Sequence, residues 1–358
     1  MNKHQRVDDV VYGAPSTAHH VIYVSDLTGA SANLGGEAYI TTHPSRRHLC
    51  IQPHGRRFTP TAKTTARKLH GHASKAHDRY TAHEAREFAM CPATVPPLSS
   101  VKALAFDVFG TTVDWRSSVT EELTLRAYRK RSSNPSPALK DRLDSLDQDD
   151  WARFAQAWRD TYVHFVRSFN PGQDVWKTID EHHRDSLVQL LGTWGLEGLY
   201  TDAEVDSLSL VWHRLAPWPD TVDGLAKLRD SGKLVLATLS NGNMDLVRDL
   251  NDFGGLGFHR LFCAETFRAY KPRPETYLGA ARDMGLEPGQ VAMVACHMGD
   301  LEAAKACGLR TIYVERPREE AWDKDGEEFV AARNWVDLWI GEEEGGFVTM
   351  ADKLLDIL

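Results

Sequence analysis

The sequence has few features of a membrane or secreted protein. No apolar segment approaches the roughly 20 residues needed to span a bilayer. The five cysteines are odd in number and widely scattered, so no disulfide framework is expected. The first residues, MNKHQRVDDVV, contain two early acids and no long apolar run, and neither a secretory signal nor a transit peptide is expected. These absences favour a reduced, cytoplasmic protein that does not bind membranes.

Residues 1–97 are short of aliphatic side chains and rich in basic ones. Residues 1–100 hold 12 Lys/Arg against 7 Asp/Glu and ten of the sixteen histidines, whereas the whole chain has a net charge of −8. Only VIYVSDL (21–27) reads as a short strand, and PATVPPLSS (92–100) reads as a linker. Such a segment buries too little apolar surface to offset its ordering entropy. We expect a poorly ordered basic, His-rich extension at 1–97, without nucleic-acid binding.

After residue 100 the pattern changes to strands alternating with helices. Helical patterns at 221–232 and 274–285 end on Gly232 and Gly285. Short continuous apolar runs, as expected for buried parallel strands, occur at 101–109, 233–240, 291–297 and 310–315. This alternation predicts an α/β fold, a doubly wound, Rossmann-like parallel sheet. Ligands bind at the carboxyl ends of strands in such folds.

The interval 117–213 interrupts this alternation. It carries Trp, Leu, Arg and Glu at helical spacing, as in DDWARFAQAWRDTYVHFVRSF. We predict an inserted helical cap domain at 117–213 over a core domain formed by 98–116 and 214–358. Most of its aromatic residues are expected to pack inside the cap; Trp176 and Arg159 are the two expected at the site.

Four motifs lie in order at the predicted strand ends or in the loops beside them. They are FDVFGTTVDW (106–115), LSNG (239–242), YKPRPETY (270–277) and ACHMGDLEAAKACGL (295–309). With these motifs the chain resembles the haloacid dehalogenase (HAD-like) superfamily, and within it the L-2-haloacid dehalogenase (type II) branch. The resemblance covers roughly residues 101–340 and none of the first hundred.

The residue two positions after the nucleophile separates the activities of this superfamily. Phosphatases carry a second acid there, which protonates the departing alkoxide. This chain has Phe109, which cannot transfer a proton, after Asp107. A halide is the anion of a stronger acid and leaves without a proton. Asp107 without a second acid therefore favours displacement at a carbon–halogen bond.

The fourth motif favours the same conclusion. A phosphatase would supply acids at 296 and 300 to hold Mg²⁺, but position 296 is a cysteine, a poor ligand for a hard cation. We expect neither a metal nor another cofactor. Asp300 remains, and its alternative role is to cap the helix that begins after it.

The resemblance implies roles for the residues of these motifs. Asp107 would attack C2 of the substrate and form an aspartyl ester, and Asp300 would be the base for the water that opens it. Lys271 would keep Asp107 ionised and help neutralise the substrate carboxylate. Thr111 and Ser240 would donate hydrogen bonds to that carboxylate or to Asp107.

Further residues are implied for the halide and for the wall of the site. Arg159, in AWRDTY, matches the arginine that the family's cap presents to the leaving halide. Asn241 would donate to the same halide, and Trp176 would supply an aromatic edge. Tyr277 matches a family tyrosine at the site, with a plain core aromatic as the alternative.

The chain departs from the branch at 295–299. Family members commonly read Ser-Ser-Asn there, with an aromatic residue just before the aspartate; this chain has Ala295, Cys296, His297 and Gly299. His297 is expected to donate a hydrogen bond or to titrate as a base, or else to be a strand-end histidine satisfied by backbone. Cys296, with apolar neighbours, is expected to be a packed thiol. These replacements are expected to alter the accepted halogen or acid, or to weaken turnover.

The sequence therefore predicts a hydrolase that converts short 2-haloalkanoic acids to 2-hydroxy acids. Two alternatives remain open: a phosphatase for a small phosphate ester, and a weak relative that acts as a binding protein through its basic N-terminal arm. A homodimer is the expectation by analogy with the family.

Overall fold

The computed structural model describes residues 38–43, 46–51, 97–133 and 135–358. Strands β1 (Ala38–His43) and β2 (Arg46–Ile51) pair antiparallel in a small sheet of their own, which the sequence pattern did not predict. The expected strand at 21–27 and most of the expected extension lie outside the described residues. The described residues from Pro97 onward belong to one compact unit, and it holds all four motifs.

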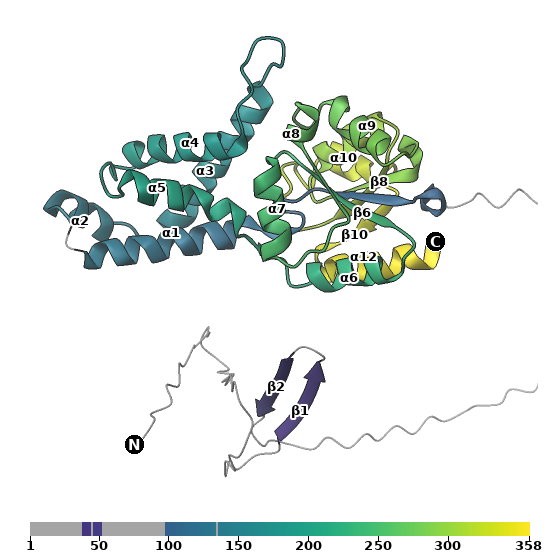
Figure 1. Ribbon diagram of the computed structural model, residues 1–358, viewed down its shortest axis with the longest axis horizontal. Helices are drawn as coiled ribbons and strands as arrows, with labels where there is room; N and C mark the ends of the chain where they lie inside the picture. Colours follow the sequence, from purple (N-terminus) through teal and green to yellow (C-terminus); the bar gives the residue numbers. More distant parts are fainter. Residues whose placement is uncertain (1–37, 44–45, 52–96, 134) are drawn as a thin grey trace, which may run out of the picture. The chain divides into compact units, whose positions relative to one another are not determined.

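A six-stranded parallel sheet is the centre of this unit, in the order β10-β9-β8-β3-β6-β7 (Figure 1). Its strands are β3 (Ala103–Phe106), β6 (Val235–Ser240), β7 (Arg260–Cys263), β8 (Val291–Ala295), β9 (Arg310–Val314) and β10 (Leu338–Ile340). Each of the four predicted apolar runs contains one of them. The prediction of a doubly wound α/β fold with an inserted cap is confirmed.

Helices cover both faces of the sheet. They are α6 (Thr221–Asp230), α7 (Met244–Phe253), α8 (Ala264–Phe267), α9 (Pro274–Asp283), α10 (Met298–Ala306), α11 (Glu327–Ala332) and α12 (Gly346–Ile357), with 3₁₀ turns η1 (Pro97–Ser100), η3 (Pro288–Gln290) and η4 (Glu342–Glu344). Successive residues of β3 point to opposite faces. Phe106 packs against Phe347 of α12 with ring centroids 5.3 Å apart, whereas Ala105 belongs to the core on the α9 and α10 side.

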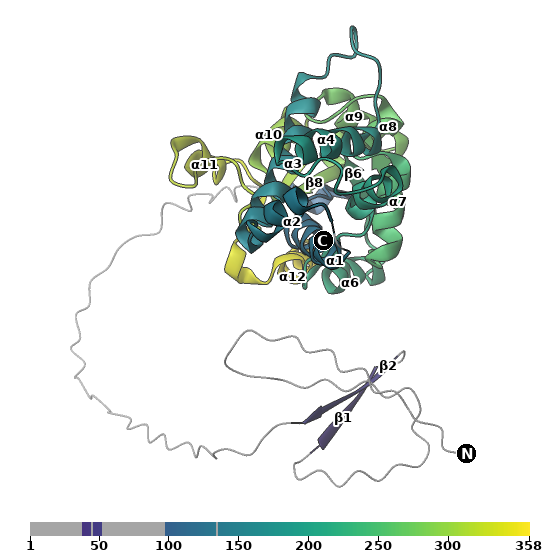
Figure 2. The ribbon, with the colours of Figure 1, turned by 90° about the vertical axis from the view of Figure 1, so that its left-hand side faces the viewer.

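The cap is a bundle of helices between two short strands. The strands β4 (Val113–Asp114) and β5 (Ala216–Pro217) pair antiparallel where the chain leaves and re-enters the core. Between them lie α1 (Trp115–Ser132), α2 (Pro137–Asp144), α3 (Gln148–Ser168), α4 (Ile179–Thr193), α5 (Asp202–Ser209) and η2 (Leu210–His213). Figure 2 presents the cap helices toward the viewer, in front of the core. Capping boxes start α3, α4 and α5, so Asp150, Glu181 and Glu204 in their first turns serve local structure.

Aromatic packing forms the interior of the cap, as its composition predicted. Trp158 meets Trp212 edge to face at 5.4 Å, and His183 stacks on Trp212 at 4.5 Å. His183 is buried, and within the described part of the chain neither of its ring nitrogens has a hydrogen-bond partner; burial lowers its pKa well below the usual value. A neutral imidazole stacked on indole therefore behaves here as a core aromatic.

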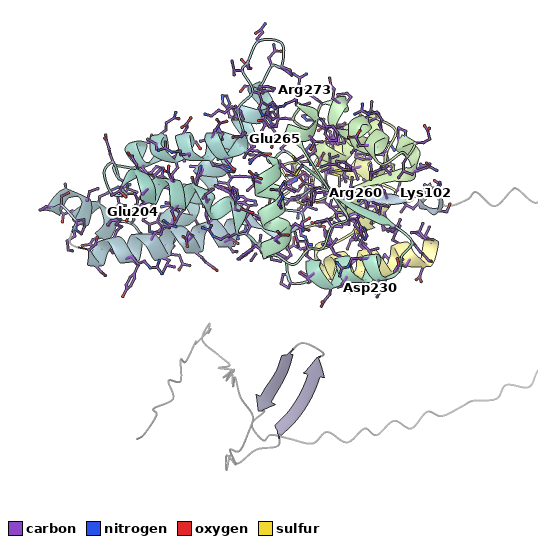
Figure 3. The ribbon with its side chains drawn as sticks, in the orientation of Figure 1. Lys102, Glu204, Asp230, Arg260, Glu265 and Arg273 are labelled. Atoms are coloured by element: carbon purple, nitrogen blue, oxygen red, sulfur yellow. The ribbon has the colours of Figure 1, made fainter. Side chains whose placement is uncertain are left out.

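Several polar contacts fasten the cap to the core. His213 lies between Asp180 of α4 and Asp249 of α7, with nitrogen–oxygen distances of 2.9 and 2.8 Å. Arg273, which lies beside the cap in Figure 3, donates to the carbonyl of Phe169 at 3.3 Å. These contacts hold the cap helices over the carboxyl ends of the strands. Among the described residues, no helix has both the length and the apolar character to cross a membrane.

Candidate active site

Asp107 lies at the carboxyl end of β3, between β6 and β8 in the sheet. Its backbone amide donates to the carbonyl of Val294 at 2.9 Å, which extends the ladder by one residue. The chain then turns sharply through Gly110, whose φ of +87° is a conformation that glycine adopts without strain. This turn returns the hydroxyl of Thr111 to Asp107, where it donates to Oδ2 at 2.7 Å.

Lys271 joins the two aspartates of the site. Its ammonium donates to Asp107 Oδ1 at 2.8 Å and to Asp300 Oδ2 at 2.6 Å, and all three side chains are nearly inaccessible to solvent. Burial alone would raise the pKa of Asp107, but Lys271 and His297 hold it well below its usual range. Burial opposes the charge on Lys271, yet both carboxylates raise its pKa. Asp107 is therefore an ionised carboxylate.

Asp300 lies in a different environment from Asp107. Its Oδ1 accepts a 2.6 Å hydrogen bond from the hydroxyl of Tyr277, on α9. Burial is the largest cause that raises the pKa of Asp300, and it outweighs the opposing effect of Lys271. Of two carboxyl groups on one ammonium, Asp300 is thus the better proton acceptor. It lies in the first turn of α10, but His297 is the residue that precedes this helix.

The side of Asp107 that faces away from Lys271 carries His297 and Cys296. His297 Nδ1 is 3.2 Å from Asp107 Oδ2. Thr111 Oγ1 accepts the backbone amide of Cys296 at 3.0 Å and lies 3.3 Å from its Sγ. Burial raises the pKa of Cys296, consistent with the expected packed thiol. Both replacements of the usual motif therefore contact the nucleophile or its hydroxyl partner.

Glu319 is a site residue that the sequence analysis missed. It belongs to the loop after β9, and its Oε2 is 3.5 Å from His297 Nε2 and accepts the indole N–H of Trp115 at 3.0 Å. Burial opposes its charge, but His297 and Trp115 lower the pKa of Glu319. A side chain on Gly110 would collide with this carboxyl group. The available signal was the polar run ERPREE directly after a buried strand.

The cap presents Arg159 to the same region. Its guanidinium lies 5.6 Å from the ring of Phe109, 5.5 Å from Trp115 and 4.4 Å from Tyr162. Its positive charge also contributes to the lowered pKa of Glu319. A cation surrounded by aromatic rings retains donors for an anion, since rings accept no strong hydrogen bond. The structure thus brings the predicted arginine close to Phe109, two residues from the nucleophile.

Two predicted residues make local contacts at the end of β6. Ser240 Oγ accepts the amide of Gly242 at 3.1 Å. Asn241 Oδ1 accepts the amide of Lys271 at 2.7 Å, and its Nδ2 donates to the Lys271 carbonyl at 3.4 Å. Asn241 therefore positions the backbone of Lys271. Its predicted contact with a halide stays a prediction.

Trp176 lies in an aromatic group at the border of the cap. It stacks on Tyr270 at 4.8 Å, meets Phe169 edge to face at 5.6 Å and lies under Arg268 at 5.4 Å. Its buried indole N–H has no hydrogen-bond partner among the described residues. These contacts connect Trp176 to the residue before Lys271, and its predicted role at the halide stays a prediction.

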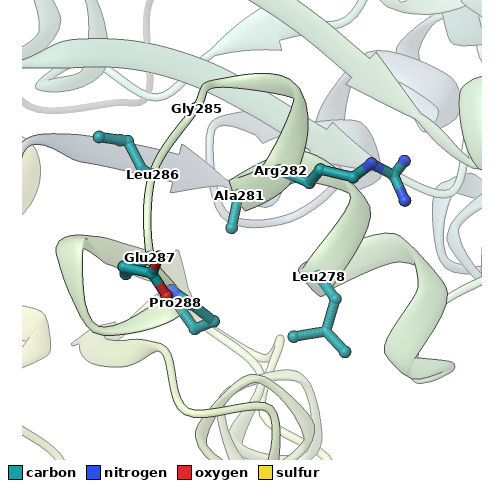
Figure 4. A pocket seen from close by; sticks show the side chains of 7 residues that line it. All are labelled: Leu278, Ala281, Arg282, Gly285, Leu286, Glu287 and Pro288. Atoms are coloured by element: carbon teal, nitrogen blue, oxygen red, sulfur yellow. The ribbon is translucent and has the colours of Figure 1, made fainter.

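A surface hollow of about 370 Å³ lies elsewhere, at the end of α9 (Figure 4). It is lined by Leu278, Ala281, Arg282, Gly285, Leu286, Glu287 and Pro288. It contains no nucleophile and none of the predicted site residues. The predicted site residues are therefore at the strand ends and not in this hollow.

The fold and the residues around Asp107 define the class of the protein. The haloacid dehalogenase-like hydrolase family matches residues 101–308, and the chain belongs to this family. The chain is 28% identical over 226 residues to an (S)-2-haloacid dehalogenase of Xanthobacter autotrophicus, a match that covers 62% of this chain and 78% of the relative.

Solved structures place the chain in the 2-haloacid dehalogenase branch of this family. One L-2-haloacid dehalogenase is 34% identical, with a TM-score of 0.58, and the match covers 71% of this chain and 99% of that one. A defluorinating L-2-haloacid dehalogenase is 31% identical, with a TM-score of 0.59 and coverage of 71% and 95%. The predicted superfamily and branch are confirmed.

Proposed function

We propose that this protein hydrolyses the carbon–halogen bond of short 2-haloalkanoic acids and releases 2-hydroxy acids. The observation that supports this most is the pairing of an ionised Asp107 with Lys271, next to Phe109 in place of a proton donor. Such a site suits a leaving group that needs no proton. The names of the similar proteins agree with this substrate class.

In the first step Asp107 attacks C2 of the substrate from the side opposite the halogen. The carbon–oxygen bond forms as the carbon–halogen bond breaks, so configuration at C2 inverts and an aspartyl ester results. Arg159 stabilises the developing halide, because its guanidinium is the charge that the cap presents near Phe109. Ser240 and Thr111 supply hydroxyl groups for the substrate carboxylate.

In the second step water attacks the carboxyl carbon of the ester. Asp300 accepts a proton from this water, as its raised pKa favours. The ester bond breaks, the 2-hydroxy acid leaves with a proton on its new hydroxyl group, and Asp107 is restored. One proton and one halide are released in each cycle. Tyr277 and Lys271 hold Asp300 in place throughout.

Halide release from both enantiomers of 2-chloropropionate and from monohaloacetates tests the proposal. The assay contains a chelator, and a parallel assay offers small phosphate esters with added Mg²⁺. We expect halide from the (S) enantiomer and the (R)-hydroxy acid as product, with no need for a divalent ion. Phosphate release that requires Mg²⁺, together with no halide release, would refute the proposal in favour of a phosphatase.

A further inference from the structure

Three side chains beside the nucleophile have the composition and spacing of a zinc site. Cys296, His297 and Glu319, here called the Cys–His–Glu cluster, offer one sulfur, one nitrogen and one oxygen ligand, all within 4.8 Å of one another. His297 Nε2 lies 3.6 Å from Cys296 Sγ and 3.5 Å from Glu319 Oε2. We propose that the Cys–His–Glu cluster binds a borderline divalent cation, Zn²⁺ or Co²⁺, next to Asp107.

The two spacings from His297 Nε2 fit tetrahedral coordination, and the third, between Cys296 Sγ and the Glu319 carboxylate, is within 4.8 Å. Zinc bonds to nitrogen, oxygen and sulfur are about 2.0–2.3 Å long, which separates neighbouring ligand atoms by about 3.3–3.8 Å. Both spacings from His297 Nε2 fall in this range. Three protein ligands leave a fourth position for water or a substrate atom, as in open zinc sites.

Groups around the cluster already orient its ligands. A metal-binding histidine usually gives its other N–H to a carboxylate, and His297 Nδ1 faces Asp107 Oδ2 at 3.2 Å. The indole N–H of Trp115 fixes the Glu319 carboxylate. Thr111 holds the backbone amide of Cys296. These contacts exist in the protein as it stands, and binding would require the Cys296 and Glu319 side chains to reach the tetrahedral spacing from their present separation of within 4.8 Å.

The donor set also selects the ion. Thiolate and imidazole suit Zn²⁺ and Co²⁺, whereas Mg²⁺ requires oxygen ligands. Binding displaces the Cys296 thiol proton and any proton on His297 Nε2 to solvent. If the proposed function holds, the bound cation lowers the rate of halide release, because it ties His297 to Asp107 and occupies space that the substrate needs.

A cobalt titration of the full chain tests binding without reference to turnover. A thiolate bound to Co²⁺ gives a charge-transfer absorption in the near ultraviolet, which histidine ligands alone do not give. This matters because ten of the sixteen histidines lie in residues 1–100. We expect one equivalent of this absorption, displaced by Zn²⁺ and unaffected by excess Mg²⁺.

Variants assign the absorption to the cluster. Cys296→Ser should abolish it, and Glu319→Gln should weaken Co²⁺ binding by at least about tenfold. The matched controls are Cys307→Ser at the end of α10 and Glu315→Gln, a loop carboxylate that pairs with Lys324; both should keep it. Absence of the absorption in the unaltered chain, or its persistence in Cys296→Ser, overturns the proposal.

Halide-release assays with added Zn²⁺ distinguish a failure of the metal site from a failure of the proposed function. We expect Zn²⁺ to suppress halide release at least tenfold and a chelator to restore it. In Glu319→Gln, Zn²⁺ should suppress halide release by a smaller factor, measured against the rate of that variant without metal. A cobalt–thiolate absorption without any halide release would support the metal site and reject the proposed function. Halide release without the absorption would reject the metal site alone.

Discussion

The core and the cap contribute to the site in different ways. The core supplies Asp107, Lys271 and Asp300, whose charges are paired within 2.8 Å and buried at strand ends or in loops beside them. The cap supplies Arg159, which lies among aromatic rings and has no resolved ion pair of its own among the described residues. The core thus holds a preorganised nucleophile, whereas the cap presents a cation ready for an arriving anion. Substitutions in the core and in the cap should therefore have different effects on activity and stability.

Asp107→Asn should have the largest effect, because it removes the only group proposed to bond to carbon. We expect halide release to fall by a factor on the order of 10⁴ or more. Initial rates with (S)-2-chloropropionate measure the loss. Asp141→Asn, at an exposed position of α2 in the cap, is the control and should keep full activity. Substantial dehalogenation by Asp107→Asn would disprove the role of this carboxylate.

Lys271→Met should reduce both activity and stability, since it leaves two carboxylates buried without their shared cation. Breaking a buried ion pair costs about 3–5 kcal/mol, and we expect that loss in the free energy of unfolding. Urea unfolding at neutral pH measures it. Lys305→Met, whose ammonium donates to the exposed carbonyl of Trp335 and lies 5.4 Å from its ring centroid, should change the value by less than about 1 kcal/mol. Equal losses of stability in the two variants would contradict the role of Lys271 as the shared cation of Asp107 and Asp300.

Arg159→Ala should lower activity without a comparable loss of stability. We expect a fall of about 10–100-fold for 2-chloropropionate and a smaller fall for 2-bromopropionate, because the poorer leaving group depends more on electrostatic help. Competitive assays of both substrates give the ratio directly. Arg153→Ala, on an exposed turn of the same helix, is the matched control. Equal losses for chloride and bromide would argue against a halide role for Arg159.

The border between cap and core should respond to pH through His213. Burial opposes its charge, yet hydrogen bonds to Asp180 and Asp249 raise the pKa of His213; His183 and Asn243 are the other polar groups around this network. Because the pKa of His213 is raised in the folded protein, its ion pairs stabilise the fold fully below the unfolded pKa of about 6.5. This stabilisation is lost as pH rises through the folded pKa.

His213→Asn should therefore cost about 1 kcal/mol more at pH 5.5 than at pH 9. Urea unfolding at the two pH values measures the difference, and the exposed His164→Asn serves as control. A cost independent of pH would show that His213 acts by shape and not by charge.

The sequence identified the part of the site that follows directly from sheet architecture. Asp107, Ser240 and Asp300 lie at or after the carboxyl ends of β3, β6 and β8, which are neighbours in the parallel sheet. Strand order therefore brings these three residues to the same edge. The polar run after β9 marks the segment that holds Glu319, but which of its carboxylates reaches His297 depends on how the loop folds back across the sheet. The pairing of Asn241 with Lys271 depends on loop folding in the same way. Cap residues such as Trp176 depend on the docking of one domain on another, which no periodicity encodes.

A single turnover in ¹⁸O-labelled water, with enzyme in excess over (S)-2-chloropropionate, distinguishes attack on C2 by Asp107 from attack on C2 by water. Mass spectrometry of the peptide that contains Asp107 and of the released lactate locates the label. We expect the heavy oxygen to enter the Asp107 carboxylate and the first lactate to be unlabelled. Heavy oxygen in the first lactate, with none in the peptide, would mean that water attacks the substrate carbon directly and that no ester forms.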